Sequence, residues 1–125
     1  MAALIALALG ANGLVMLVAG RWWYGAVPGV TETGPFNPHF VKDIGAAYAV
    51  VGVAFAWLAL RPSRTAIGAG AAATLFLALH ALIHLTDAIG APAGLADLAR
   101  DFPAVILPAL VAIWIVWPLK ETRHA

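Results

Sequence analysis

Two histidines and an aspartate lie at helical spacing in LHALIHLTDAIG, residues 79–90, at the end of a long apolar stretch. An α-helix advances about 100° per residue, so the side chain of His84 lies about 40° around the axis from that of His80. Asp87 lies about 20° from His80 on the other side. The three side chains therefore share one helix face. Two imidazoles four residues apart are a common way to direct nitrogen ligands at one metal ion.

A second pair, His39 and Asp43, has the same four-residue spacing at the start of another apolar stretch. With a rise of about 1.5 Å per residue, Asp43 and His84 are expected at one depth, about 6 Å below one end of the protein. His80 is expected about 12 Å below that end, level with Asn12 of the first apolar stretch. Ionisable residues inside a membrane bundle usually face its interior and have partners, so we expect these side chains to converge.

The predicted site binds a transition metal, and the expected ligands are His80, His84 and Asp43. Asp87 and His39 are expected as alternative ligands or as groups that orient a metal-bound imidazole. Asn12 and Tyr48 are expected behind the ligands, although Tyr48 lies about 140° around its helix from Asp43. Nitrogen and oxygen ligands without sulfur suit copper, zinc or iron. Redox chemistry, hydrolysis and transport are all open for such a metal, as is whether the protein is an enzyme.

Three other interpretations of the same residues stay open. The His–Asp pairs could satisfy one another as a structural network that fixes the register of the helices. Protonation of a histidine could instead make them a proton or small-ligand site. Haem b is a further option, with His39 and one histidine of residues 79–90 as axial ligands, because axial ligands must approach from opposite faces.

The composition indicates that membrane-spanning segments hold these residues. The chain has 125 residues, of which 63% are hydrophobic and 10% charged, whereas a soluble domain carries about 25% charged residues. A small domain buries only about 60–70% of the surface that its unfolded chain exposes. The excess apolar surface is therefore expected to face a lipid bilayer.

Four apolar segments are each close to the roughly 20 residues that cross a bilayer as a helix. Helices are expected at about residues 2–20, 39–60, 66–88 and 102–118. None of these segments alternates as the strands of a membrane barrel do. The predicted fold class is therefore all-α, an integral membrane four-helix bundle that residues 1–125 form as a single domain. Pro108 is expected to kink the last helix or to free a backbone carbonyl.

Basic residues predict the orientation of the bundle. Arg61 and Arg64 flank a very short loop, and Lys120 and Arg123 lie in the C-terminal tail. Basic residues are more frequent in cytoplasmic loops, so both termini are expected on the cytoplasmic side. The His/Asp site would then lie in the outer leaflet of a bacterial inner membrane.

Composition and small residues also limit the partners. The net charge is +1 and no basic cluster exists, so no nucleic-acid partner is expected. The chain has no cysteine, which excludes thiolate metal sites and cysteine nucleophiles.

Small residues recur at four-residue spacing, which permits close helix packing within the chain or in a homo-oligomer. The pairs are Gly45 and Ala49, Gly52 and Ala56, and Gly68 and Ala72. These pairs and the small size favour an alternative function, that of a non-catalytic accessory or assembly subunit of a larger membrane complex.

Residues 33–48, TGPFNPHFVKDIGAAY, follow a long first loop and enter the second apolar segment. With the four short helices, this stretch resembles the small bacterial four-helix membrane proteins grouped as DoxX-like. The resemblance implies the same membrane architecture and a link to redox complexes. It implies no role for any individual residue.

Overall fold

The computed structural model describes residues 1–121, which are helical with short connections and contain no strand. The elements are α1 (Ala2–Ala26), η1 (Val30–Thr33), α2 (Pro38–Leu60), α3 (Arg64–Gly90), α4 (Gly94–Asp101), η2 (Phe102–Ile106) and α5 (Leu107–Glu121). Four helical stretches are long and apolar enough to cross a membrane, namely α1, α2, α3 and the composite Gly94–Pro118. The predicted all-helical class with four such stretches is confirmed. The second and third stretches extend one or two residues beyond their predicted bounds, whereas the first ends six residues later and the fourth begins eight residues earlier than predicted.

Side-chain caps explain where α2 and α3 begin. The side-chain oxygen of Asn37 accepts hydrogen bonds from the backbone N–H groups of His39 and Phe40, each at 3.1 Å. Pro38 occupies the first turn of α2, where an N–H would lack a helical partner in any case. The hydroxyl of Ser63 accepts a hydrogen bond from the N–H of Ala66 at 3.1 Å and caps α3 in the same way.

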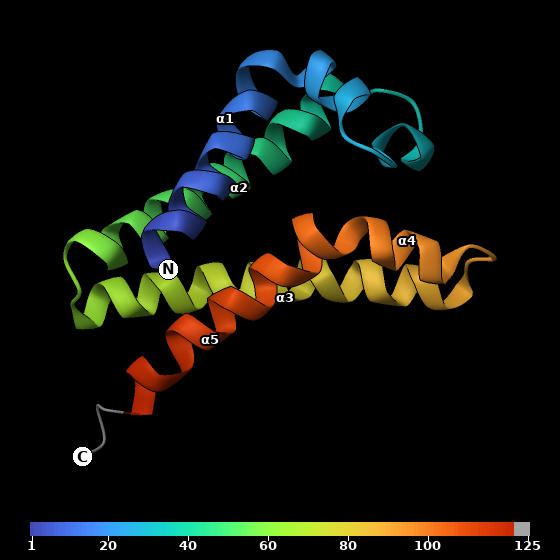
Figure 1. The fold of residues 1–125 in the computed structure, drawn as a ribbon. Helices are drawn as coiled ribbons and strands as arrows, with labels where there is room; N and C mark the ends of the chain where they lie inside the picture. Colours follow the sequence, from blue (N-terminus) through green and yellow to red (C-terminus); the bar gives the residue numbers. More distant parts are fainter. Residues whose placement is uncertain (122–125) are drawn as a thin grey trace.

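Glycines allow α1 and α2 to pack closely side by side (Figure 1). A Cβ atom placed on Gly13 would lie 2.6 Å from both the Gly45 carbonyl oxygen and the Ala49 nitrogen. A Cβ atom on Gly52 would lie 2.6 Å from the Cα of Gly10. The backbones approach this closely because glycine presents no side chain at the contact. The small-residue spacing of α2 therefore packs α2 against α1 of the same chain.

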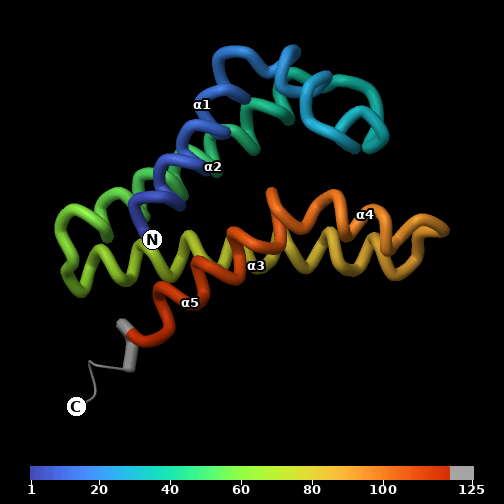
Figure 2. The backbone as a smooth tube through the Cα atoms, in the orientation of Figure 1, coloured from blue at the N-terminus to red at the C-terminus, as the bar shows by residue number. Residues whose placement is uncertain are grey.

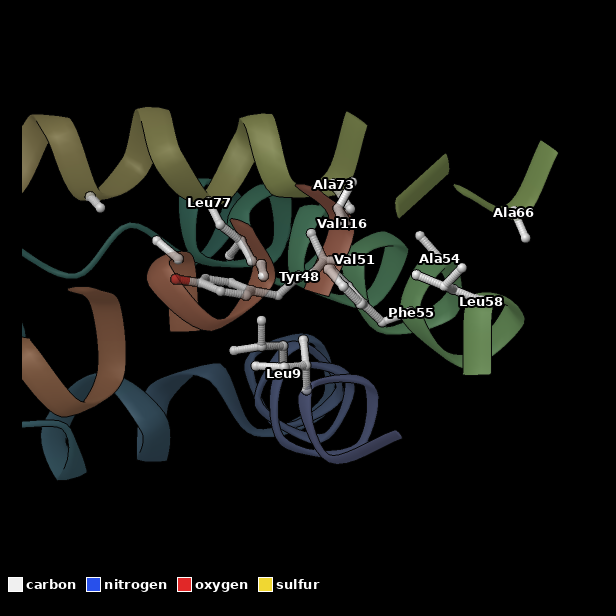
Figure 3. Close-up of a cluster of buried hydrophobic side chains, with 14 of the residues drawn as sticks. Leu9, Tyr48, Val51, Ala54, Phe55, Leu58, Ala66, Ala73, Leu77 and Val116 are labelled. Carbon is white, nitrogen blue, oxygen red and sulfur yellow. The ribbon is translucent and has the colours of Figure 1, made fainter. Parts of the chain in front are cut away.

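The hydrophobic core lies where α1, α2, α3 and α5 meet (Figure 3). The largest fully buried side chains are Phe55, Met16 and Val51. Leu9 of α1, Leu77 of α3 and Val116 of α5 belong to the same core. Because α2 supplies Val51 and Phe55, it is the central helix that links α1 to the rest of the protein.

The four long stretches form two parts that diverge (Figure 1). The α1–α2 pair meets α3 near the short turn of residues 61–63, and α5 crosses α3 and also contacts α1. Away from that turn the α1–α2 pair separates from α3, while α4 runs along the last turns of α3 (Figure 2). We call this end the loop end, because it holds the loop of residues 27–37 and the turn of residues 91–93.

The fourth stretch is interrupted by a wide turn. The N–H of Leu107 donates to the carbonyl of Phe102, five residues earlier, so Phe102–Ile106 forms a π-helical turn. Pro108 explains this turn, since it has no N–H for the carbonyl of Ala104 and its ring crowds that carbonyl. The break that Pro108 was expected to cause thus lies one turn earlier in the chain. It allows α4 to leave the axis of α5 and to lie against α3.

Candidate functional site

His84 of α3 forms a short hydrogen bond with Asp101 at the end of α4. The imidazole Nδ1 lies 2.7 Å from the Asp101 Oδ2, and the two side chains are 31% and 15% exposed. The two residues lie side by side because α4 runs back along α3 and both residues are about equally far in sequence from the turn of residues 91–93. A distance of this size lies at the short end of the range for N–H···O hydrogen bonds.

Arg100 joins Asp101 to two further carboxylates. Its Nε lies 2.9 Å from the Asp101 Oδ1, and one terminal nitrogen lies 3.0 Å from the Asp97 Oδ1. The same terminal nitrogen lies 3.2 Å from the Glu32 Oε2, which belongs to η1. We call Glu32, His84, Asp97, Arg100 and Asp101 the polar cluster. It places three carboxylates around one guanidinium, so the cluster is acidic while the imidazole is neutral.

The loop of residues 27–37 is shaped to receive Arg100. Gly29 has a φ angle of +82°, and a Cβ atom there would lie 2.5 Å from the Arg100 guanidinium carbon. Only glycine leaves room for the guanidinium and tolerates this backbone conformation without strain. The hydroxyl of Tyr24 donates a hydrogen bond to the Gly34 carbonyl, which holds the loop to the end of α1. The loop is thus tied both to α1 and to α4.

A row of four neighbouring rings, of which the first is His84, runs from the polar cluster into the protein. The ring centroids of His84 and His80 are 4.9 Å apart, and the His80 ring is stacked on Phe76 at 6.0 Å. Tyr48 of α2 lies edge-on to His80, with ring centroids 5.9 Å apart, and is itself buried. Tyr48, which was expected behind the site, therefore lies directly against one of its histidines. The rings connect the polar cluster to the core.

The structure does not bring Asp43 to these histidines. Its Oδ2 lies 3.5 Å from the Nε2 of His39, one turn earlier on α2, and the side chains are 60% and 88% exposed. Because the α1–α2 pair diverges from α3 toward the loop end, the face of α2 that carries His39 and Asp43 remains exposed, although Val41 in the same turns is buried. Asp87 is also exposed and makes no hydrogen bond or ion pair with any of residues 1–121.

The ligand group predicted for the metal is consequently not assembled in the described part of the chain. Among residues 1–121, no three or more His, Asp or Glu side chains are placed so that they could hold one metal ion. His80 and His84 do lie together, as their spacing predicted. Their carboxylate neighbour is Asp101 and not Asp43.

Asn12 has partners within its own helix. The indole nitrogen of Trp23 donates to the Asn12 Oδ1 at 2.9 Å, and the Asn12 amide lies 3.7 Å from the Met16 sulfur. In a straight helix, residues eleven apart would be separated by about 16 Å along the axis. The backbone leaves helical geometry at Ala19, with φ −135° and ψ 37°, and this kink brings Trp23 back toward Asn12. A kink of this kind could not be predicted from the spacing of polar residues.

The residues that sequence reasoning missed are Asp101, Arg100, Asp97 and Glu32. The predicted fourth helix begins at about residue 102, so Asp101 falls just outside the predicted helices. One signal was available in the sequence. A turn of a few residues after position 90 starts an antiparallel helix, so Asp101 must return to the level of His84. The sequence carried no comparable signal for Glu32, which lies 68 residues from Arg100.

Comparison of the chain with protein-family models, curated proteins and solved structures finds no match in any of the three. The resemblance to DoxX-like proteins therefore stays a prediction, based on the four-helix architecture and on residues 33–48. The function has to be argued from the geometry of the site.

Proposed function

We propose that this chain is a multi-pass membrane protein in which α1, α2, α3 and the stretch from η2 through α5 cross the bilayer. The support is the length and hydropathy of α1, α2, α3 and the stretch Gly94–Pro118, which contains η2 and most of α5, together with the outer surfaces of these helices. Large apolar side chains are exposed on each helix, including Leu7, Val50, Leu60, Ile89 and Trp114. A surface of this kind is stable in contact with lipid and costly in water.

We further propose that the loop end faces away from the cytoplasm of a bacterial cell. Arg61 and Arg64 lie at the opposite end, on either side of the turn between α2 and α3. Lys120 follows in the last helix at that end, and Arg123, which supported the same prediction, lies outside the described residues. Basic residues in short loops favour the cytoplasmic side, so both termini would be cytoplasmic. The polar cluster would then lie near the outer membrane–water boundary.

Within this protein, we propose that the polar cluster and His80 take up and release protons. The observation that carries the proposal is the 2.7 Å hydrogen bond between His84 and Asp101, which is partly buried among charged groups. Three carboxylates against one guanidinium leave the cluster with a formal charge of −2 while His84 is neutral. A proton bound to His84 makes the cluster less negative and makes the hydrogen bond between His84 and Asp101 charge-assisted.

His80 gives the proton a second position. An imidazole accepts a proton on one nitrogen and releases one from the other, so neighbouring imidazoles can pass protons along. The His80 and His84 rings are 4.9 Å apart, and His80 lies on the side of the buried Tyr48. Ionisable residues in membrane helices commonly mark such proton relays. Because proton exchange between two imidazoles is reversible, a proton could move from the polar cluster toward the core or from the core toward the polar cluster.

Proton flux in liposomes tests this function. The purified chain is reconstituted in vesicles that contain a pH-sensitive dye, and a potassium diffusion potential drives protons inward. We expect flux above that of empty vesicles in the unchanged protein, with loss of that flux in His84→Ala and in Asp101→Asn. His39→Ala is the matched control. Like His84, His39 pairs with a carboxylate, that of Asp43, but its side chain is exposed. Flux equal to that of empty vesicles, or flux that His84→Ala leaves unchanged, would contradict the proposal.

A transition-metal site remains a second candidate, supported by the adjacency of the His80 and His84 rings on one face of α3. Asp101 would replace Asp43 as the nearby carboxylate, and the remaining ligands of copper, zinc or iron would come from solvent or substrate. Elemental analysis of the detergent-purified protein tests this candidate. Near-stoichiometric metal that a His80→Ala, His84→Ala double variant loses would support it, and metal-free protein after exposure to each ion would exclude it.

A further inference from the structure

The hydroxyl of Tyr48 is buried without a hydrogen-bond partner in the described chain. The residue is only 6% exposed, and its ring contacts are with Phe76 and His80. No backbone or side-chain group of residues 1–121 forms a hydrogen bond with this hydroxyl. Figure 3 shows its oxygen pointing away from Val51 and Phe55, toward the loop end. Buried hydroxyls nearly always have a partner, so the missing partner requires an explanation.

His80, which is half-buried beside Tyr48, also lacks a hydrogen-bond partner among the described residues. Its ring makes aromatic contacts with Tyr48, Phe76 and His84, but within the described residues neither ring nitrogen has a hydrogen-bond partner. A neutral imidazole has one N–H donor and one acceptor nitrogen. The phenol of Tyr48 likewise offers one donor and one acceptor. Two neighbouring side chains therefore have complementary groups that no protein atom satisfies.

We propose that Tyr48 and His80 together hold an ordered water molecule. Water is the smallest ligand that donates and accepts at once, and buried waters typically bridge polar groups that lack other partners. The two rings lie edge-on with centroids 5.9 Å apart, one on α2 and the other on α3, so the two side chains with unsatisfied groups are direct neighbours. The proposed water would lie between α2, which carries Tyr48, and α3, which carries His80.

This water extends the row of ionisable groups into the core. The order becomes Tyr48, water, His80, His84 and Asp101, so that a proton on His80 has a hydrogen-bonded neighbour on its inner side. The role of the water in proton transfer rests on the proposed function. The presence of the water rests only on the unsatisfied groups of Tyr48 and His80. An experiment can therefore contradict the proton transfer without contradicting the water, and the reverse.

Water-edited nuclear magnetic resonance of the protein in lipid vesicles tests the site. The chain contains two tyrosines, so Tyr24→Phe in a sample labelled with ¹³C at the tyrosine Cζ leaves the signal of Tyr48 alone. We expect magnetisation from water to reach this buried carbon quickly. His80→Phe keeps a ring against Phe76 but removes both nitrogens, so we expect it to slow the transfer.

Absence of rapid transfer to Tyr48 in the Tyr24→Phe sample would overturn the proposal, even if His80→Phe does not fold. Rapid transfer that a folded His80→Phe variant leaves unchanged would also overturn it, because the water would then not bridge the two residues. Rapid transfer in a protein that shows no proton flux would support the water site and contradict only the proposed function.

Discussion

Asp101 is the residue on which the polar cluster depends. Its two carboxylate oxygens are divided between His84 of α3 and the neighbouring Arg100, at 2.7 Å and 2.9 Å. At 15% exposure, Asp101 is the least exposed member of the ion pairs at this end. Loss of either partner would leave a partly buried charge with fewer hydrogen bonds, which is more costly than loss of an exposed pair.

Substitution of His84 should therefore destabilise the protein more than substitution of His39. Hydrogen bonds to charged groups contribute about 1.5–3 kcal/mol, so we expect His84→Ala to lower the free energy of unfolding by about 1–2 kcal/mol after allowance for its partial exposure. His39→Ala should change it by less than about 0.5 kcal/mol, because that pair is largely exposed. The measurement is unfolding in mixed detergent micelles, followed by circular dichroism.

Equal effects of the two substitutions would show that the His84–Asp101 bond contributes no more than an exposed pair. The same would follow if Asp101→Asn were as stable as the unchanged protein, since the amide keeps the size of the side chain and removes only its charge.

At the scale of the helices, contacts between backbones determine how α1 and α2 pair. Gly13 has backbone atoms of α2 at 2.6 Å from its potential Cβ position, so any side chain there forces the helices apart. Gly45 of α2, which forms a small-residue pair with Ala49, is packed as closely, with the Gly13 carbonyl oxygen 3.0 Å from its potential Cβ position. Gly68 of α3 has no heavy atom within 4 Å of that position, although it forms a pair with Ala72 at the same spacing. The spacing is therefore shared by packed and unpacked glycines.

The substitutions Gly13→Ala and Gly68→Ala should thus have opposite effects. Alanine in the interior of a helix is about 1 kcal/mol more favourable than glycine, so Gly68→Ala should be neutral or stabilising. At Gly13 the added methyl group overpacks the contact, and we expect a net loss of about 1–3 kcal/mol. Thermal unfolding of both variants in detergent measures the difference. A Gly13→Ala variant as stable as Gly68→Ala would contradict the close α1–α2 contact.

The whole molecule consists of a tight α1–α2 pair and an α3–α4–α5 part that diverge toward the loop end (Figure 2). At that end the ion pair between Arg100 and Glu32 connects the two parts, and the guanidinium rests against Gly29. The polar cluster therefore has a second effect besides its chemistry, since it ties the first loop to α4. The cluster lies at the loop end of the proposed membrane protein, where Glu32 is largely exposed and the other four members are partly buried.

Single cysteines can test the proposed orientation, because the chain has none of its own. Pro62→Cys lies in the turn between α2 and α3, and Ala93→Cys lies in the turn before α4. In intact bacterial cells whose outer membrane is permeabilised, we expect a membrane-impermeant maleimide to label only the Ala93→Cys variant. Both variants should react once the inner membrane is opened with detergent, which serves as the control. Labelling of Pro62→Cys alone in intact cells would reverse the orientation, and labelling of both would contradict insertion of α3 across the bilayer.

The amino-acid sequence by itself determined the four long apolar helices and where several of them begin. Asn37 with Pro38 and Ser63 are local signals, because a cap acts on backbone groups only two or three residues away. The adjacency of His80 and His84 was equally local, since both lie on one face of one helix. Four stretches of about 20 apolar residues were sufficient to predict the helical class, because helices satisfy their own backbone groups.

Only the tertiary structure decided which carboxylate meets these histidines. The choice between Asp43 and Asp101 depends on how far α2 diverges from α3, and that divergence follows from packing along the whole α1–α2 pair. The partners of Asn12 and Arg100 depend on a kink at Ala19 and on a loop 68 residues away in sequence from Arg100. Helical periodicity gives the direction of a side chain relative to its own helix axis. The rotation and tilt of each axis are set by contacts between helices, and these contacts selected the residues of the site.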